Sequence, residues 1–261
     1  MKILTECNLA ELVVDLLSGK TIVFPTETSY GLGCDATNQA AVDKIFKIKG
    51  RKSDKPLLVV VPTVEMARKY LAWSDLLGTL AKKYWPGPLT VVGLYVPPLF
   101  KEGIEGWSRT NGKRLLGFIR TIGMRSELRK NKTKAEKLCE IYNTATTARP
   151  HPTLHLKGEE TLADGVVSSE GTVAIRVTAN PLLKSITEKL GKPLVATSAN
   201  VADGGDSYSA ESVIAQFQNR AVQPDIILDY GELPKRPPTT IVSVIGGKFK
   251  VFRQGEQEVS V

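Results

Sequence analysis

A cluster of cations lies where a predicted helix ends, in the run KGRKSDKPL that begins at Lys49. Lys49 comes seven residues after Val42, so it falls on the apolar stripe of that helix, and we expect it to point inward or along a cleft. Alone, it could equally be a lysine that snorkels at a helix C-terminus. However, Lys49, Arg51 and Lys55 are three cations within seven residues, and they repel one another unless an anion lies among them. The cluster therefore favours a phosphate or carboxylate ligand.

Two segments rich in polar side chains each follow a predicted strand. Thr26, Thr28 and Ser29 follow TIVF, and Thr197, Ser198 and Asn200 follow PLVA. Singly, such residues are more often turn or cap residues. In α/β sheets, however, strand ends line the ligand crevice, where these side chains can bind a carboxylate, an ammonium group or a phosphate.

Other chemical signals are weak. The run GKT at residues 19–21 lacks the first glycine of a phosphate loop, because Val14 stands there, and it precedes a strand instead of a helix. His151 and His155 are separated by Pro152, and the three cysteines have no metal-ligand or disulfide spacing. No hydrolase elbow or dinucleotide fingerprint is present, and we predict no metal site made of side chains.

The elements that must position these residues alternate along the chain. In the first part we expect helices at about 8–18, 39–49, 64–71 and 76–85, strands at 21–24, 56–61 and 88–96, and a loop from Pro25 to Gly33. In the second part we expect strands at 172–177, 193–196 and 225–228, helices at 181–190 and 209–217, and a closing hairpin around Gly246. The pattern predicts one mixed α/β domain over residues 1–261.

A basic insertion at about 100–170 interrupts this pattern, and we interpret it as a helical hairpin. The net charge of the chain is +8, and residues 101–140 hold 11 Lys or Arg against 5 Asp or Glu. Such a cluster suggests a polyanionic partner, RNA more readily than a membrane, although a solvated loop remains equally open. No apolar run approaches the roughly 20 residues that span a bilayer, and the polar start of the chain does not resemble an export signal. We expect a cytoplasmic protein.

Six motifs, taken together, resemble one family. PTETSYGLGCDA, KIFKIKGRKSDKPLLVVV, WPGPLTVV, TVAIRV, TSAN and PTTIVSVIGGKFKVFRQG look like the successive motifs of the YrdC family of threonylcarbamoyl-AMP synthases. The likeness covers everything except roughly residues 100–170. It implies an α/β fold with a twisted mixed sheet around a concave basic cleft. It also implies that L-threonine, bicarbonate or CO2 and ATP with Mg2+ give threonylcarbamoyl-AMP and pyrophosphate, for N6-threonylcarbamoyladenosine formation in tRNA by a separate threonylcarbamoyl transferase.

The resemblance also implies roles for individual residues. The catalytic K-x-R and S-x-N pairs are Lys49, Arg51, Ser198 and Asn200. Threonine would contact Thr26 and Thr28, together with Lys49, Arg51 and Ser198. The nucleotide would contact Lys55, Thr90, Thr172, Arg176, Asn200 and Arg253.

The chain departs from the family pattern in several places. Ala202 and Asp203 stand where a serine and a glycine are usual, Thr239 replaces a serine, and the chain ends soon after RQG, like a short family form without the extra C-terminal domain. Two alternatives stay open: a non-catalytic protein of this fold that binds tRNA or double-stranded RNA, and carbamoyl transfer as in hydrogenase-maturation proteins. RNA binding would depend on Arg125, Arg129 and Lys130.

Overall fold

A computed structural model describes residues 1–51, 56–98, 160–202 and 204–260. The chain divides into two compact units, one made of Met1–Pro97 with Gly158–Val261 and the other of Pro98–Lys157. The first unit carries the motifs and is described below. Leu162, Ala163 and Val166 belong to its core, so this unit resumes at Gly158 and not at the expected boundary near residue 170. The predicted helical hairpin lies outside the described residues.

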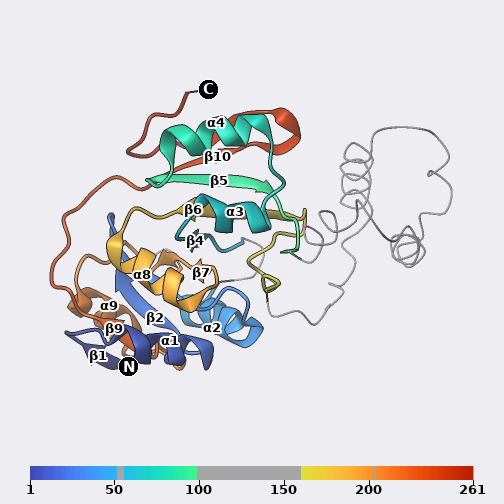
Figure 1. Ribbon diagram of the computed structural model, residues 1–261. Coiled ribbons are helices and arrows are strands. Elements are labelled where there is room, and N and C mark those ends of the chain that lie inside the picture. Colours follow the sequence, from blue (N-terminus) through green and yellow to red (C-terminus); the bar gives the residue numbers. More distant parts are fainter. Residues whose placement is uncertain (52–55, 99–159, 203, 261) are drawn as a thin grey trace, which may run out of the picture. The chain divides into compact units, whose positions relative to one another are not determined.

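Six strands form a mixed sheet in the order β11-β10-β5-β6-β4-β7 (Figure 1). They are β4 (Val59–Val61), β5 (Leu89–Leu94), β6 (Thr172–Val177), β7 (Leu194–Val195), β10 (Thr240–Ser243) and β11 (Lys250–Arg253). Strand β6 lies at its centre, antiparallel to β5 and parallel to β4. Its residues alternate between two faces, so Val173, Ile175 and Val177 enter the main core while Arg176 lies on the opposite face.

Five strands form a second mixed sheet in the order β1-β9-β2-β3-β8. They are β1 (Lys2–Leu4), β2 (Ile22–Pro25), β3 (Tyr30–Gly33), β8 (Thr197–Ser198) and β9 (Ile226–Leu228). Strands β2 and β3 form an antiparallel hairpin, and β8 pairs with the other edge of β3. This pairing brings the Thr26–Ser29 turn and the TSAN segment to one part of the molecule.

The helices begin and end at the residues that cap them. They are α1 (Leu9–Leu17), α2 (Gln39–Lys49), α3 (Val64–Tyr70), α4 (Asp75–Tyr84), α8 (Pro181–Leu190) and α9 (Ala210–Phe217). The side chains of Asn8, Asn38 and Asn180 accept hydrogen bonds from the first turns of α1, α2 and α8. Gly50 and Gly191 end α2 and α8 in the left-handed conformation that favours glycine. These caps confirm the helix boundaries expected from sequence within one or two residues.

Two apolar clusters hold this unit together. The main core includes Ile45 and Phe46 of α2 with the inward residues of β5 and β6. A second cluster lies where α1 packs against α8, and includes Leu16, Ile186 and Val60. Because α2 is anchored in the main core, the direction of its last residue, Lys49, is set by packing.

The sequence interpretation needs three corrections in this unit. Residues 30–33 form strand β3 instead of the end of a loop, because the second arm of the hairpin pairs with β2. Lys2–Leu4 form β1 by pairing with the distant β9, and the strands divide between two sheets instead of one.

No helix in the described ranges has the length and apolar character needed to cross a membrane.

Candidate functional site

The side chain of Lys49 is buried at the end of α2, with 3% of its surface exposed. Its Nζ donates hydrogen bonds to the carbonyl oxygen of Ser198 at 2.6 Å, the carbonyl oxygen of Asn200 at 2.9 Å and Asn200 Oδ1 at 2.8 Å. A lysine ammonium has three protons to donate, so this group is fully engaged with the TSAN loop. The structure thus joins Lys49 of the predicted K-x-R pair to the predicted S-x-N pair, about 150 residues away in the chain.

Asn200 is the centre of this loop. Its Oδ1 also accepts a hydrogen bond from Ser198 Oγ at 2.8 Å, and its Nδ2 donates to the carbonyl oxygen of Gly204. The backbone N–H of Ala202 donates to the carbonyl oxygen of Lys49 at 2.9 Å. These bonds hold the loop over the end of α2, so Lys49 organises the Ser198 and Asn200 side chains.

Burial gives the Lys49 ammonium an unusual acidity. Burial and the neighbouring charge of Arg51 lower the pKa of Lys49 to about 8, while the carboxylate of Asp206 acts in the opposite direction. An anionic ligand nearby would favour the charged form and raise this pKa. Arg51 lies just after Gly50, with its backbone N–H bonded to the carbonyl oxygen of Phe46. Lys55, the third predicted cation, lies outside the described residues.

The β2–β3 turn presents the predicted threonine-binding hydroxyls. Thr26 Oγ1 donates to the carbonyl oxygen of Ser29 at 2.6 Å and accepts from the backbone N–H groups of Thr28 and Ser29 at 3.2 and 3.3 Å. Thr26 therefore closes the turn. This is the role of a turn residue, which the sequence analysis gave as the alternative to ligand binding. Thr28 Oγ1 lies 3.2 Å from Thr26 Oγ1.

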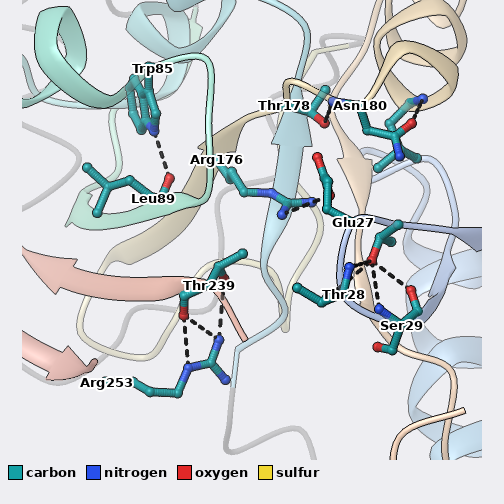
Figure 2. Close-up of polar contacts among 12 residues, drawn as sticks. Glu27, Thr28, Ser29, Trp85, Leu89, Arg176, Thr178, Asn180, Thr239 and Arg253 are labelled. Atoms are coloured by element: carbon teal, nitrogen blue, oxygen red, sulfur yellow. Dashed lines mark hydrogen bonds and ion pairs between the residues drawn. The ribbon is translucent and has the colours of Figure 1, made fainter. Parts of the chain in front are cut away.

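Between these threonines, Glu27 points toward the guanidinium of Arg176 (Figure 2). Arg176 Nη1 lies 3.4 Å from Glu27 Oε2, and the arginine is 5% exposed. Burial lowers the pKa of Arg176, and Glu27 acts against that shift. Thr90 on β5 is fully buried, and the antiparallel register that pairs Val91 with Ile175 places its backbone position opposite Arg176.

Thr172 lies at the other end of β6 from Arg176. It begins β6, four residues before Arg176, which corresponds to a separation of about 13 Å along a strand. Its hydroxyl lies 2.8 Å from the hydroxyl of Ser168. The nucleotide-binding roles of Thr172 and Arg176 both stay predictions.

Arg253 contacts Thr239, the residue before β10 that replaces the usual serine of the family. Its Nε and Nη2 donate to the carbonyl oxygen of Thr239 at 3.1 and 2.9 Å (Figure 2). Burial lowers the pKa of Arg253, and the charge of Asp206 opposes this shift. Because Asp206 also acts on Lys49, one carboxylate is within electrostatic reach of both cations.

Glu27 and Asp206 are the two site residues that the sequence interpretation missed. Glu27 stands between two residues that it did select, and Asp206 follows Asn200 by six positions. An acidic residue inside a hydroxyl-rich turn was the available signal for Glu27. The approach of Asp206 to cations of α2 and β11 depends on tertiary structure and has no local signal. Within the described residues, no group of three acidic, histidine or cysteine side chains is placed to hold a metal ion.

Comparison with known proteins identifies relatives of this chain. The Sua5/YciO/YrdC family model, described as "Telomere recombination", matches residues 15–115 and 108–255. The threonylcarbamoyl-AMP synthase of Pseudoalteromonas atlantica is 27% identical over 227 residues, which cover 86% of this chain and 88% of that protein.

Solved structures share the fold. Sua5 from P. abyssi, complexed with L-threonine, has a TM-score of 0.66 and 22% identity, and the match covers 97% of this chain but only 57% of Sua5. YciO from E. coli has a TM-score of 0.61 and 18% identity, with 98% of this chain and 95% of YciO covered. The chain thus spans little more than half the length of that Sua5 protein, and nearly all of YciO.

Proposed function

The chain belongs to the Sua5/YciO/YrdC family, and we propose that it is a nucleotidyltransferase that makes threonylcarbamoyl-AMP. Its substrates would be L-threonine, bicarbonate or CO2, and ATP as its Mg2+ complex, and its products the adenylate and pyrophosphate. The named relative supports this reaction. The observation that carries the proposal is the bonding of the Lys49 ammonium to both Ser198 and Asn200, because it joins the K-x-R motif to the S-x-N motif.

The proposed chemistry needs a concentration of positive charge. The amine of threonine adds to CO2 and loses a proton to form a carbamate, and a carbamate oxygen then attacks the α-phosphorus of ATP while pyrophosphate leaves. Carbamate, carboxylate and triphosphate must therefore approach one another. Guanidinium groups that can bind oxyanions through paired N–H groups are supplied by Arg51, Arg176 and Arg253. Lys49 contributes its positive charge beside the TSAN loop, to which it is hydrogen-bonded.

Positioning supplies the other part of catalysis. The proposal needs no covalent intermediate, so the main tasks are orientation of the carbamate and stabilisation of charge at phosphorus. Ser198 and Thr28 lie on neighbouring parts of one sheet, since β8 pairs with β3 immediately after the turn. Their hydroxyls are suited to orienting the carboxylate of threonine. The Mg2+ would be held by the phosphates of ATP, with few protein ligands.

Pyrophosphate release tests the function directly. Purified protein with ATP and Mg2+ should release pyrophosphate only when both L-threonine and bicarbonate are present. Lys49→Ala should lower kcat by about 100-fold or more, a loss typical of a removed electrostatic group. Lys47→Ala is the matched control, because Lys47 is an exposed residue of the same last helical turn. Lys49→Gln, checked by circular dichroism, separates loss of chemistry from loss of folding.

The outcome is decisive in either direction. Release of pyrophosphate that requires both substrates supports the synthase, and identification of the adenylate by mass spectrometry completes the assignment. Release without threonine, or no release under conditions in which a known synthase is active, would overturn it. If the adenylate is formed, we expect a separate threonylcarbamoyl transferase to consume it and modify tRNA.

A further inference from the structure

A buried polar cluster at the adjoining ends of β5 and β6 has hydrogen-bonding capacity to spare. Within the described part of the chain, two buried atoms in it that can donate, Arg176 Nε and Thr90 Oγ1, have no hydrogen-bond partner, while Glu27 Oε2 has an ion pair with Arg176 Nη1 at 3.4 Å. Buried polar atoms in folded proteins nearly always find a partner, and an exception calls for an explanation. The cluster therefore has the character of a site completed by a ligand.

The strand register shows what ligand would fit. Thr90 and Arg176 lie at neighbouring positions of β5 and β6, on the face opposite to the core residues Val91 and Ile175. Both residues are buried, and each has a donor group, one N–H and one O–H, without a hydrogen-bond partner in the described part of the chain. Two such donors match a single oxyanion, either a phosphate or a carboxylate oxygen.

Glu27 approaches this pair from the other sheet. The hydroxyl of Thr26 bonds to the backbone of Thr28 and Ser29 across Glu27, so Glu27 projects from a closed turn. Its Oε2 meets Nη1 of Arg176 and not Nε, which leaves Nε available (Figure 2). An isolated buried guanidinium is costly, and a carboxylate partner offsets that cost.

We propose that Glu27 is a positioning residue, which orients the guanidinium of Arg176 so that Nε, together with Thr90 Oγ1, binds an oxyanion of the substrate. Glu27 acts through Arg176 and not on the reacting atoms. The inference deepens the proposed function, since that function identifies the oxyanion as belonging to ATP or to the threonine moiety. Both sources share the same chemistry at this cluster, and the experiment distinguishes them.

A double-mutant cycle tests this role. Glu27→Ala should lower kcat/KM by about 10- to 100-fold, the size expected when a catalytic group is misplaced. Glu27→Gln, whose amide oxygen can still accept from the guanidinium, should retain activity within about threefold of the wild type. In an Arg176→Ala background, Glu27→Ala should cause no further loss, because residues that act as a unit are not additive.

Binding measurements identify the source of the oxyanion. Calorimetric titrations with ATP and with L-threonine should show that Arg176→Ala and Glu27→Ala weaken the same ligand, and that ligand carries the oxyanion. Glu188→Ala is the matched control, because Glu188 is an exposed carboxylate on α8 that pairs with Lys184 at 3.9 Å. This variant should keep wild-type kinetics and binding.

Several outcomes would overturn the inference. Additive losses in the double variant would show that Glu27 acts independently of Arg176. Equal losses in Glu27→Gln and Glu27→Ala would rule out orientation through an accepting oxygen, and a lower melting temperature with unchanged kinetics would leave only a structural role. If the wild type releases no pyrophosphate, the proposed function fails, and the cycle measured on ligand affinity then decides the role of Glu27. Failure of the wild type to bind either ligand would overturn both.

Discussion

Lys49 acts as an internal organiser at the scale of the single residue. Because all three of its protons are donated to Ser198 and Asn200, it contributes positive charge without offering a free donor to a substrate. Its contact with a phosphate would require exchange of one of these bonds. This differs from the direct neutralisation of substrate oxygens expected from sequence, although both interpretations need its charge.

The acidity of Lys49 leads to a pH-dependent prediction. Its pKa in the folded protein is about 8, below the ordinary lysine value of 10.5, so between these values the unfolded chain binds more protons than the folded one. The contribution of Lys49 to the free energy of unfolding is therefore least favourable below about pH 8 and improves as pH rises toward 10.5. Bound ATP should restore the charge, and calorimetry near pH 8.5 in buffers of different ionisation enthalpy should detect uptake of part of a proton.

Two results would contradict this account of Lys49. One is ATP binding near pH 8.5 without proton uptake by the wild type. The other is an unfolding free energy that depends on pH in the same way in the wild type and in Lys49→Gln. The substituted side chain has no titrating group at this position, so the difference between the two profiles isolates the lysine.

At the scale of the element, the end of α2 positions both members of the K-x-R pair. Gly50 has φ of 63° and separates Lys49 from Arg51, so the direction of Arg51 depends on a left-handed residue. A side chain added at Gly50 would come within 2.7 Å of Arg220 Nη2, the mobile end of a long side chain. At Gly191, the corresponding residue of α8, φ is 69° and the space is open.

These two glycines provide a matched pair of variants. Gly50→Ala and Gly191→Ala should each lower the free energy of unfolding by about 1–2 kcal/mol, because both place Cβ in a left-handed conformation. Only Gly50→Ala should also lower kcat/KM, since it shifts Arg51 relative to Lys49. Chemical denaturation and the pyrophosphate assay measure the two effects, and equal activity of the two variants would show that the α2 terminus tolerates displacement.

At the scale of the whole molecule, most of the net positive charge belongs to a sequence segment other than those that form the motif-bearing unit. Most of the net charge of +8 belongs to residues 101–140, outside the described residues. RNA binding by that segment therefore stays a prediction, distinct from synthesis of the adenylate. Whether RNA binding is independent of adenylate synthesis can be tested, because the charges of residues 101–140 can be changed without altering any residue assigned to the site.

Neutralising the insertion should separate RNA affinity from chemistry. Replacement of Arg125, Arg129 and Lys130 by glutamine should weaken tRNA binding and reduce its dependence on salt, because fewer counterions are released. Threonine-dependent pyrophosphate release should be unchanged. Electrophoretic mobility shifts at several salt concentrations measure the first effect, and unaltered tRNA affinity would exclude these residues as the contact.

The sequence by itself determined the helices, most of the strands and the inward direction of Lys49. Caps such as Asn8, Asn180 and Gly50, and apolar periodicity, act within a few residues and can be recognised locally. Only the tertiary structure decided that residues 30–33 pair as a strand, that the strands form two sheets, and that Glu27 meets Arg176. These features depend on hydrogen bonds and charges between segments remote in the chain, whose proximity is a result of packing and has no local pattern.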